Sequence, residues 1–149
     1  RSISAQPRGR FPAWGWVALV WTVAWWVLAW NRWPWFVPLQ RYTFFPLWLG
    51  FIVTVNALVE LRGGSCLLRR APRAWFSLFV LSAGFWWVFE WLNRFVRNWH
   101  YVGVQDFSAL EYFVHATLCF STVLPAVAAV AEWLAASTGW VQRLAHGPA

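Results

Sequence analysis

The chain has 149 residues, of which 60% are hydrophobic and 11% are charged. A soluble domain of this size usually carries about a quarter charged residues, so the composition excludes an ordinary soluble protein. The net charge is +7, from twelve arginines and five acidic residues. Because the arginines lie between apolar runs and form no polar stripe, they favour anionic lipid headgroups as partners and argue against nucleic acid.

The first two predicted membrane spans lie in the N-terminal half of the chain. A helix needs about 20 apolar residues to cross ~30 Å of hydrocarbon. Residues 12–30 meet this length, with Pro12 in the opening turn, and the Asn31-Arg32-Trp33-Pro34 that follows is no signal-peptide cleavage site. Residues 31–42, with two prolines, form a break. The second span covers residues 43–61, with Thr43 as its N-cap, and Arg62-Gly63-Gly64 ends it.

The third and fourth predicted spans cover residues 74–95 and 109–134. Ser108 or Asp106 is expected to cap the fourth span, and Pro125 to kink it. The fold expected is therefore an all-α integral membrane protein, a bundle of four transmembrane helices with short loops. Residues 1–149 form a single transmembrane domain in this interpretation.

Orientation follows from the arginines, because positively charged residues concentrate in cytoplasmic loops. With four spans, both termini share a side with the 62–73 loop. That side carries eight arginines: Arg1, Arg8, Arg10, Arg62, Arg69, Arg70, Arg73 and Arg143. The opposite side carries four: Arg32, Arg41, Arg94 and Arg97. The bias predicts cytoplasmic N and C termini in a bacterial-type inner membrane.

Sixteen tryptophans are the most unusual feature of the composition. Their amphipathic rings are favoured at the membrane–water interface. Such a belt accounts for nine that fall near span ends: Trp14, Trp16, Trp30, Trp33, Trp35, Trp75, Trp99, Trp133 and Trp140. Seven fall deeper: Trp21, Trp25, Trp26, Trp48, Trp86, Trp87 and Trp91. The pairs 21/25 and 87/91 each share a helix face, where they fill gaps between helices or meet a partner subunit.

Polar side chains near the outer ends of the third and fourth spans form the candidate site. Glu90 and Arg94 share one helix face, and so do Glu111 and His115. Glu90 lies ~8 Å and His115 ~9 Å below the outer boundary, at 1.5 Å per residue. Spans joined by a short hairpin are neighbours, so the sequence predicts that these side chains meet in an outer-side polar pocket.

Several interpretations of this pocket remain open. It can be a structural clamp in which Glu90 pairs with Arg94 or His115. It can bind a cofactor: a quinone, a chlorin-type pigment on His115, or a haem between His100 and His115. It can be an acid–base pair of an enzyme, Glu90 with His115. No catalytic motif and no metal-ligand cluster is present in the sequence, so no catalytic residue or metal ligand is assigned.

The remaining polar residues have simpler interpretations. Glu60 and Glu132 lie at the cytoplasmic ends of their spans, where an arginine is expected to satisfy each carboxylate. Cys66 and Cys119 lie at different depths, so no disulfide is expected. Small residues on the fourth span are expected to receive a partner helix closely. They are Ala126, Ala128, Ala129, Ala131, Ala135 and Ala136.

The function favoured by the sequence is that of a non-catalytic accessory or structural subunit of a larger membrane complex, of an energy-converting, respiratory or photosynthetic kind. The short loops leave no room for a soluble catalytic domain, which argues against an enzyme. The expected partners are the lipid bilayer and other integral membrane subunits. The alternatives are a small redox, quinone- or pigment-binding protein that uses His115, and a membrane enzyme that uses Glu90 and His115.

Overall fold

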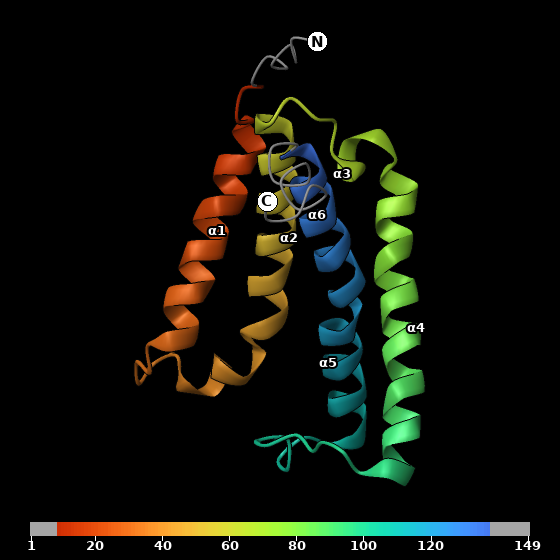
Figure 1. The fold of residues 1–149 in the computed structure, drawn as a ribbon. Helices are drawn as coiled ribbons and strands as arrows, with labels where there is room; N and C mark the ends of the chain where they lie inside the picture. Colours follow the sequence, from red (N-terminus) through yellow and green to blue (C-terminus); the bar gives the residue numbers. More distant parts are fainter. Residues whose placement is uncertain (1–8, 138–149) are drawn as a thin grey trace, which may run out of the picture.

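The computed structural model describes residues 9–137, and in that part the chain is helical with no strand. Two helical hairpins make up the fold (Figure 1). The elements are α1 (Ala13–Trp30), η1 (Val37–Tyr42), α2 (Phe44–Leu61), α3 (Leu67–Arg70), α4 (Pro72–Val96), α5 (Ala109–Ser121) and α6 (Val123–Ala136). The first hairpin is α1–α2, joined by the 3₁₀ helix η1. The second is α4 with α5–α6, joined by residues 97–108.

Four helical segments are long and apolar enough to cross a membrane: α1, α2, α4 and the segment Ala109–Ala136, which consists of α5 and α6. Their bounds lie within two residues of the predicted spans. The all-α, four-span prediction is therefore confirmed, and the chain is a multi-pass membrane protein. The short helix α3, in the connection between the hairpins, was not predicted.

The helices stand side by side in the order α1, α2, α5–α6, α4 (Figure 1). α1 packs chiefly on α2, and α4 packs on both α5 and α6. α2 packs extensively on α6 and only slightly on α5, so the two hairpins join mainly at the end that carries α3. At the other end, which carries η1, the contact between the hairpins depends on loops. We call these the α3 end and the η1 end.

The α2–α6 contact forms the core of the protein. Its buried members are Ile52, Val55, Trp75, Ala126 and Ala129. The two alanines let α2 approach α6 closely, as small residues do between membrane helices. Part of the alanine stripe therefore receives a helix of this chain. Trp75 is 5% exposed in this core, so the prediction that it belongs to the interfacial belt is wrong.

The fourth span is interrupted at Thr122, three residues before Pro125. Proline has no N–H to donate and clashes with the carbonyl of the residue four positions earlier, which here is Ser121. The break at this point separates the N–H of Leu124 from the carbonyl of Phe120. Ser82 of α4 fills the gap: its hydroxyl donates to Phe120 O at 2.5 Å and accepts from Leu124 N at 3.1 Å. Pro125, which was expected to kink the span, is thus preceded by a break in the helix at Thr122.

The helix starts differ in how they are capped. Ser108 caps α5 as predicted, with its Oγ accepting from Glu111 N at 3.2 Å. Thr43 occupies the N-cap position of α2, but its hydroxyl donates to Gln40 O at 2.9 Å and does not cap α2. The expected side-chain cap fails because η1 leads directly into α2 with Thr43 already in a helical conformation.

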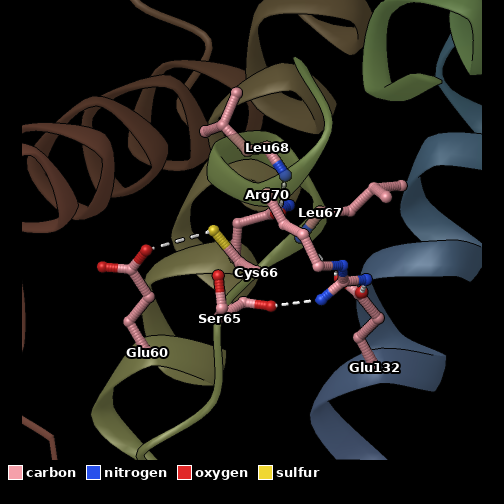
Figure 2. Close-up of polar contacts among 8 residues, drawn as sticks. Glu60, Ser65, Cys66, Leu67, Leu68, Arg70 and Glu132 are labelled. Carbon is pink, nitrogen blue, oxygen red and sulfur yellow. Dashed lines mark hydrogen bonds and ion pairs between the residues drawn. The ribbon is translucent and has the colours of Figure 1, made fainter. Parts of the chain in front are cut away.

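A polar network surrounds α3 (Figure 2). Glu60 pairs with Arg69 at 3.3 Å and accepts from the Cys66 thiol at 3.4 Å. Glu132 pairs with Arg70 at 2.5 Å and accepts from Leu67 N at 2.9 Å. Each carboxylate at this end of a span is therefore satisfied by an arginine, as predicted. Both bonds tie the α3 connection to the ends of α2 and α6.

Candidate functional site

Two adjoining cavities lie at the η1 end. The first, of about 440 Å³, is lined by Arg32, Val37, Gln40, Arg41, Val102, Gly103, Val104, Phe107 and His115. The second, of about 400 Å³, is lined by Phe44, Trp86, Tyr101, Val104, Tyr112, His115, Ala116, Cys119, Phe120 and Val123. We call them the polar cavity and the apolar cavity. His115 and Val104 line both, so they form the boundary between the two.

His115 is half-buried on α5 and is held mainly by aromatic side chains. The edge of its ring meets the rings of Tyr42 and Phe107, with centroids 5.5 and 5.4 Å apart. Its Nε2 lies 3.6 Å from the Sγ of Cys119, one helical turn further along α5. The imidazole therefore reaches the boundary of the cavities from a fixed position. No carboxylate in the described part of the chain is bonded to it.

Glu111 connects the two hairpins. The Ser108 cap sets it in the first turn of α5, where its Oε1 accepts a hydrogen bond from the Tyr42 hydroxyl of η1. Tyr42 also stacks on Phe107 with centroids 6.0 Å apart. The bond to Glu111 is the main reason that the pKa of Tyr42 is raised above its ordinary value of 10.0. The phenol therefore stays protonated and remains a donor at neutral pH.

Glu90 fixes the loop that closes the second hairpin. Its Oε1 accepts from Trp99 Nε1 at 2.9 Å and from the Tyr101 hydroxyl at 2.6 Å. One turn later, Asn93 accepts from the N–H groups of residues 98 and 99 and donates to Trp99 O at 2.8 Å. Burial, followed by the bond to Glu90, raises the pKa of Tyr101. These contacts fold residues 97–108 back and bring Tyr101 into the wall of the apolar cavity.

The structure brings the four predicted site residues to the same end of the molecule but does not join them. Glu90 lines a separate cavity of about 380 Å³, and Trp86 and Tyr101 line both that cavity and the apolar one beside His115. Arg94 is exposed, and the described residues contain no ion pair between it and Glu90. The pairing of Glu90 with Arg94 or His115, expected for a clamp, is absent from these contacts. Glu90 clamps a loop instead.

The ligand sets considered for His115 find limited support. His100, the second histidine of the haem hypothesis, lies exposed in the 97–108 loop. Within residues 9–137, no group of three or more His, Cys, Asp or Glu side chains is placed to hold a metal ion. The neighbours of His115 are aromatic rings, a thiol and two cavities. This environment suits contact with a bound molecule at the imidazole edge.

Sequence reasoning missed the side chains that build the site from the loops. Two rings, Tyr42 and Phe107, contact His115, and Gln40 lines the polar cavity. All three come from segments that hydrophobic periodicity identified only as breaks between spans. Trp99 and Tyr101 follow Glu90 by nine and eleven residues, a spacing that no single helix face connects. Arg97 ends α4 with φ 51°, in the left-handed region.

The arrangement offers an amphipathic site: arginine and amide groups on one side of His115, and aromatic and aliphatic side chains on the other. Comparison of the chain with protein-family models, curated proteins and solved structures finds no match.

Proposed function

We propose that this membrane protein binds an amphipathic molecule at the η1 end, with a polar head in the polar cavity and an apolar body in the apolar cavity. The observation that carries the proposal is the shared boundary: His115 and Val104 line both spaces. A ligand that passes this boundary meets arginines on one side and Phe44, Trp86 and Phe120 on the other. His115 offers a polar ring nitrogen at the point where head and body join.

The dimensions agree with this role. Small-molecule sites are usually cavities of about 300–1,000 Å³, lined mainly by apolar side chains with a few polar groups. The apolar cavity, of about 400 Å³, has this composition and accommodates a flat ring or part of a chain. The group of ligands thus includes lipids and lipid-soluble rings such as quinones or pigments. Glu90 holds Tyr101 in the wall of the apolar cavity, and Glu111 holds Tyr42, whose ring packs against His115.

Photo-crosslinking with a neutral long-chain alcohol that carries a diazirine tests this function. In phosphatidylcholine nanodiscs, we expect labelling to concentrate on the α5 peptides that line the apolar cavity. Ala116 is buried and lines this cavity, so Ala116→Phe fills it and is expected to reduce that labelling about tenfold. Ala131→Phe, at an exposed position on α6, is the matched control and should leave labelling unchanged. Uniform labelling of all lipid-facing helices, unaffected by Ala116→Phe, would contradict the proposal.

A second candidate is the accessory subunit of a larger complex. Ala131 and Ala135 lie one turn apart and exposed on α6, whereas Ala126 and Ala129 already contact α2. Exposed small residues at this spacing favour a neighbouring helix over lipid. Replacing both exposed alanines with leucine should dissociate a partner on native gels in mild detergent. If the purified chain migrates as a lone monomer before and after the change, the subunit role is excluded.

We also propose that the α3 end faces the cytoplasm of a bacterial-type inner membrane. Described arginines at the α3 end are Arg10, Arg62, Arg69, Arg70 and Arg73; Arg1, Arg8 and Arg143 lie outside the described residues. Arg32, Arg41, Arg94 and Arg97 lie at the η1 end. The excess at the α3 end supports this orientation. A cysteine introduced at Gly103 should react with a membrane-impermeant maleimide from the outside, and protection there would reverse the orientation.

A further inference from the structure

We infer that the amphiphile is an acid, whose anionic phosphate or carboxylate oxygens bind Arg32 and Arg41 in the polar cavity. The inference rests on the proposed function and adds the chemistry of the head. It follows from two observations: the charge of the polar cavity and the position of Arg41.

The polar cavity is lined by positively charged side chains. Arg32 and Arg41 both line it, and no aspartate or glutamate does. In the described part of the chain, neither guanidinium forms an ion pair. The carboxylate of Glu111 is not part of this lining, and its Oε1 accepts from the Tyr42 hydroxyl. Two guanidinium groups beside one cavity attract an anionic head, because arginine binds phosphate and carboxylate oxygens through several N–H groups at once.

Arg41 is held at the edge of this space by aromatic rings. Its guanidinium carbon lies 5.3 Å from the centroid of Phe107 and 5.8 Å from that of Tyr42. Such cation–π contacts orient the flat group while leaving its N–H donors available. Phe107 and Tyr42 are also the rings that enclose His115. The arginine that binds the head and the histidine at the boundary are therefore positioned by the same two side chains.

Competition for the diazirine alcohol in neutral nanodiscs tests the head. The competitors are dodecyl phosphate, dodecanoate, dodecanol and inorganic phosphate, at pH 8, where both long-chain acids are ionised. We expect dodecyl phosphate and dodecanoate each to compete at about tenfold lower concentration than dodecanol, and inorganic phosphate to be inactive. High salt should reduce the advantage of both acids, because exposed arginines are screened.

Variants assign the effect to residues. Arg41→Gln and, separately, Arg32→Gln should each remove most of the advantage of dodecyl phosphate and dodecanoate over dodecanol. Arg94→Gln, at the same end of the molecule but outside the polar cavity, is the matched control and should have no effect. The salt dependence of the unmodified protein keeps the test decisive if an arginine variant fails to fold.

Each contrary outcome is distinct. Equal competition by dodecyl phosphate, dodecanoate and dodecanol would overturn the acidic head and leave the proposed function standing. Competition by inorganic phosphate at the same concentration as dodecyl phosphate would show a free-phosphate site and overturn the lipid source. Failure of the alcohol itself to label the apolar cavity would remove the proposed function on which the inference rests.

Discussion

The hydroxyl of Tyr42 donates a hydrogen bond to Glu111 Oε1, joining two residues that are 69 positions apart in the chain. Tyr42 is the last residue of η1, in the first hairpin, and Glu111 lies in the first turn of α5, in the second. Because α2 and α5 contact each other only slightly, this bond is a principal connection between the hairpins at the η1 end. It also places the Tyr42 ring against His115, so the geometry of the candidate site depends on it.

Tyr42→Phe is expected to destabilise the protein in a pH-dependent way. The pKa of Tyr42 is raised above 10.0 chiefly by its bond to Glu111, so the folded state favours the protonated phenol. Its contribution to stability is therefore complete below pH 10 and is lost as the pH rises through the raised pKa. Thermal melts in detergent should show a higher Tm for the unmodified protein at pH 8, and the difference should shrink above pH 10. A difference that stays constant from pH 8 to pH 11 would contradict this assignment.

Ser82→Ala is expected to weaken the contact between α4 and the fourth span. Ser82 is 1% exposed, and its removal leaves the carbonyl of Phe120 and the N–H of Leu124 without their bridge. A buried polar group left unpaired costs about 1–3 kcal/mol, and bonds between membrane helices usually fall near the lower end. Unfolding in mixed detergent measures the loss. The control is Ser77→Ala, since the Ser77 hydroxyl is exposed and bonds only within α4, to Arg73 O. Equal effects of the two changes would refute the bridging role.

Glu90→Ala is expected to release the 97–108 loop. Glu90 holds the loop through Trp99 and Tyr101, whereas Arg94 on the same helix is exposed and forms no ion pair among the described residues. Hydrogen exchange of loop amides should accelerate at least tenfold in Glu90→Ala, less in Glu90→Gln, which keeps an acceptor oxygen, and not in Arg94→Ala. If Arg94→Ala accelerates exchange as much as Glu90→Ala, the loop is held by another means.

Cys66 is expected to be an unreactive thiol. Burial, the largest cause, raises its pKa to about 11 from an ordinary value of 9.0. At pH 8 only about one thiol in a thousand is then ionised, and the thiolate is the reactive form. In a Cys119→Ser background, maleimide labelling should be slow at pH 8 and rise about tenfold per pH unit toward pH 11. Protein denatured in SDS provides the control, in which the labelling rate should reach half its maximum near pH 9. A labelling rate that is half-maximal near pH 9 in the folded protein would contradict the buried environment.

The spans could be predicted because their signals are local. Hydrophobic length fixed the helix bounds within two residues, and the Ser108 cap needs only residues 108–111. The ion pairs of Glu60 and Glu132 followed from their position at span ends, where arginines are close. Pro125 predicted a kink, and the helix breaks at Thr122, in the turn before the proline. The Ser82 bridge across this break comes from another helix and could not be predicted.

The candidate site could be predicted only in part, because its contacts join distant segments. Depth matching placed Glu90 and His115 at the same end, yet their partners come from residues 36–43 and 97–108, where periodicity carries no information. Nothing in the sequence indicates that Tyr42 meets Glu111 or that Trp99 folds back on Glu90. Trp87 and Trp91 were expected to share a helix face; the neighbour that Trp87 meets, Phe113 of α5 with centroids 5.1 Å apart, could not be predicted. The Trp21–Trp25 pair, within one helix, is present at 5.8 Å.

The most direct test of the central claim is native mass spectrometry of the protein extracted in mild detergent, with the retained lipid identified. We expect one acidic amphiphile to be bound per chain. It should be lost in Ala116→Phe, because phenylalanine fills the apolar cavity, and kept in Ala131→Phe, because that position is exposed. If the unmodified protein and Ala116→Phe retain the same lipids in the same amounts, the two cavities are not a binding site.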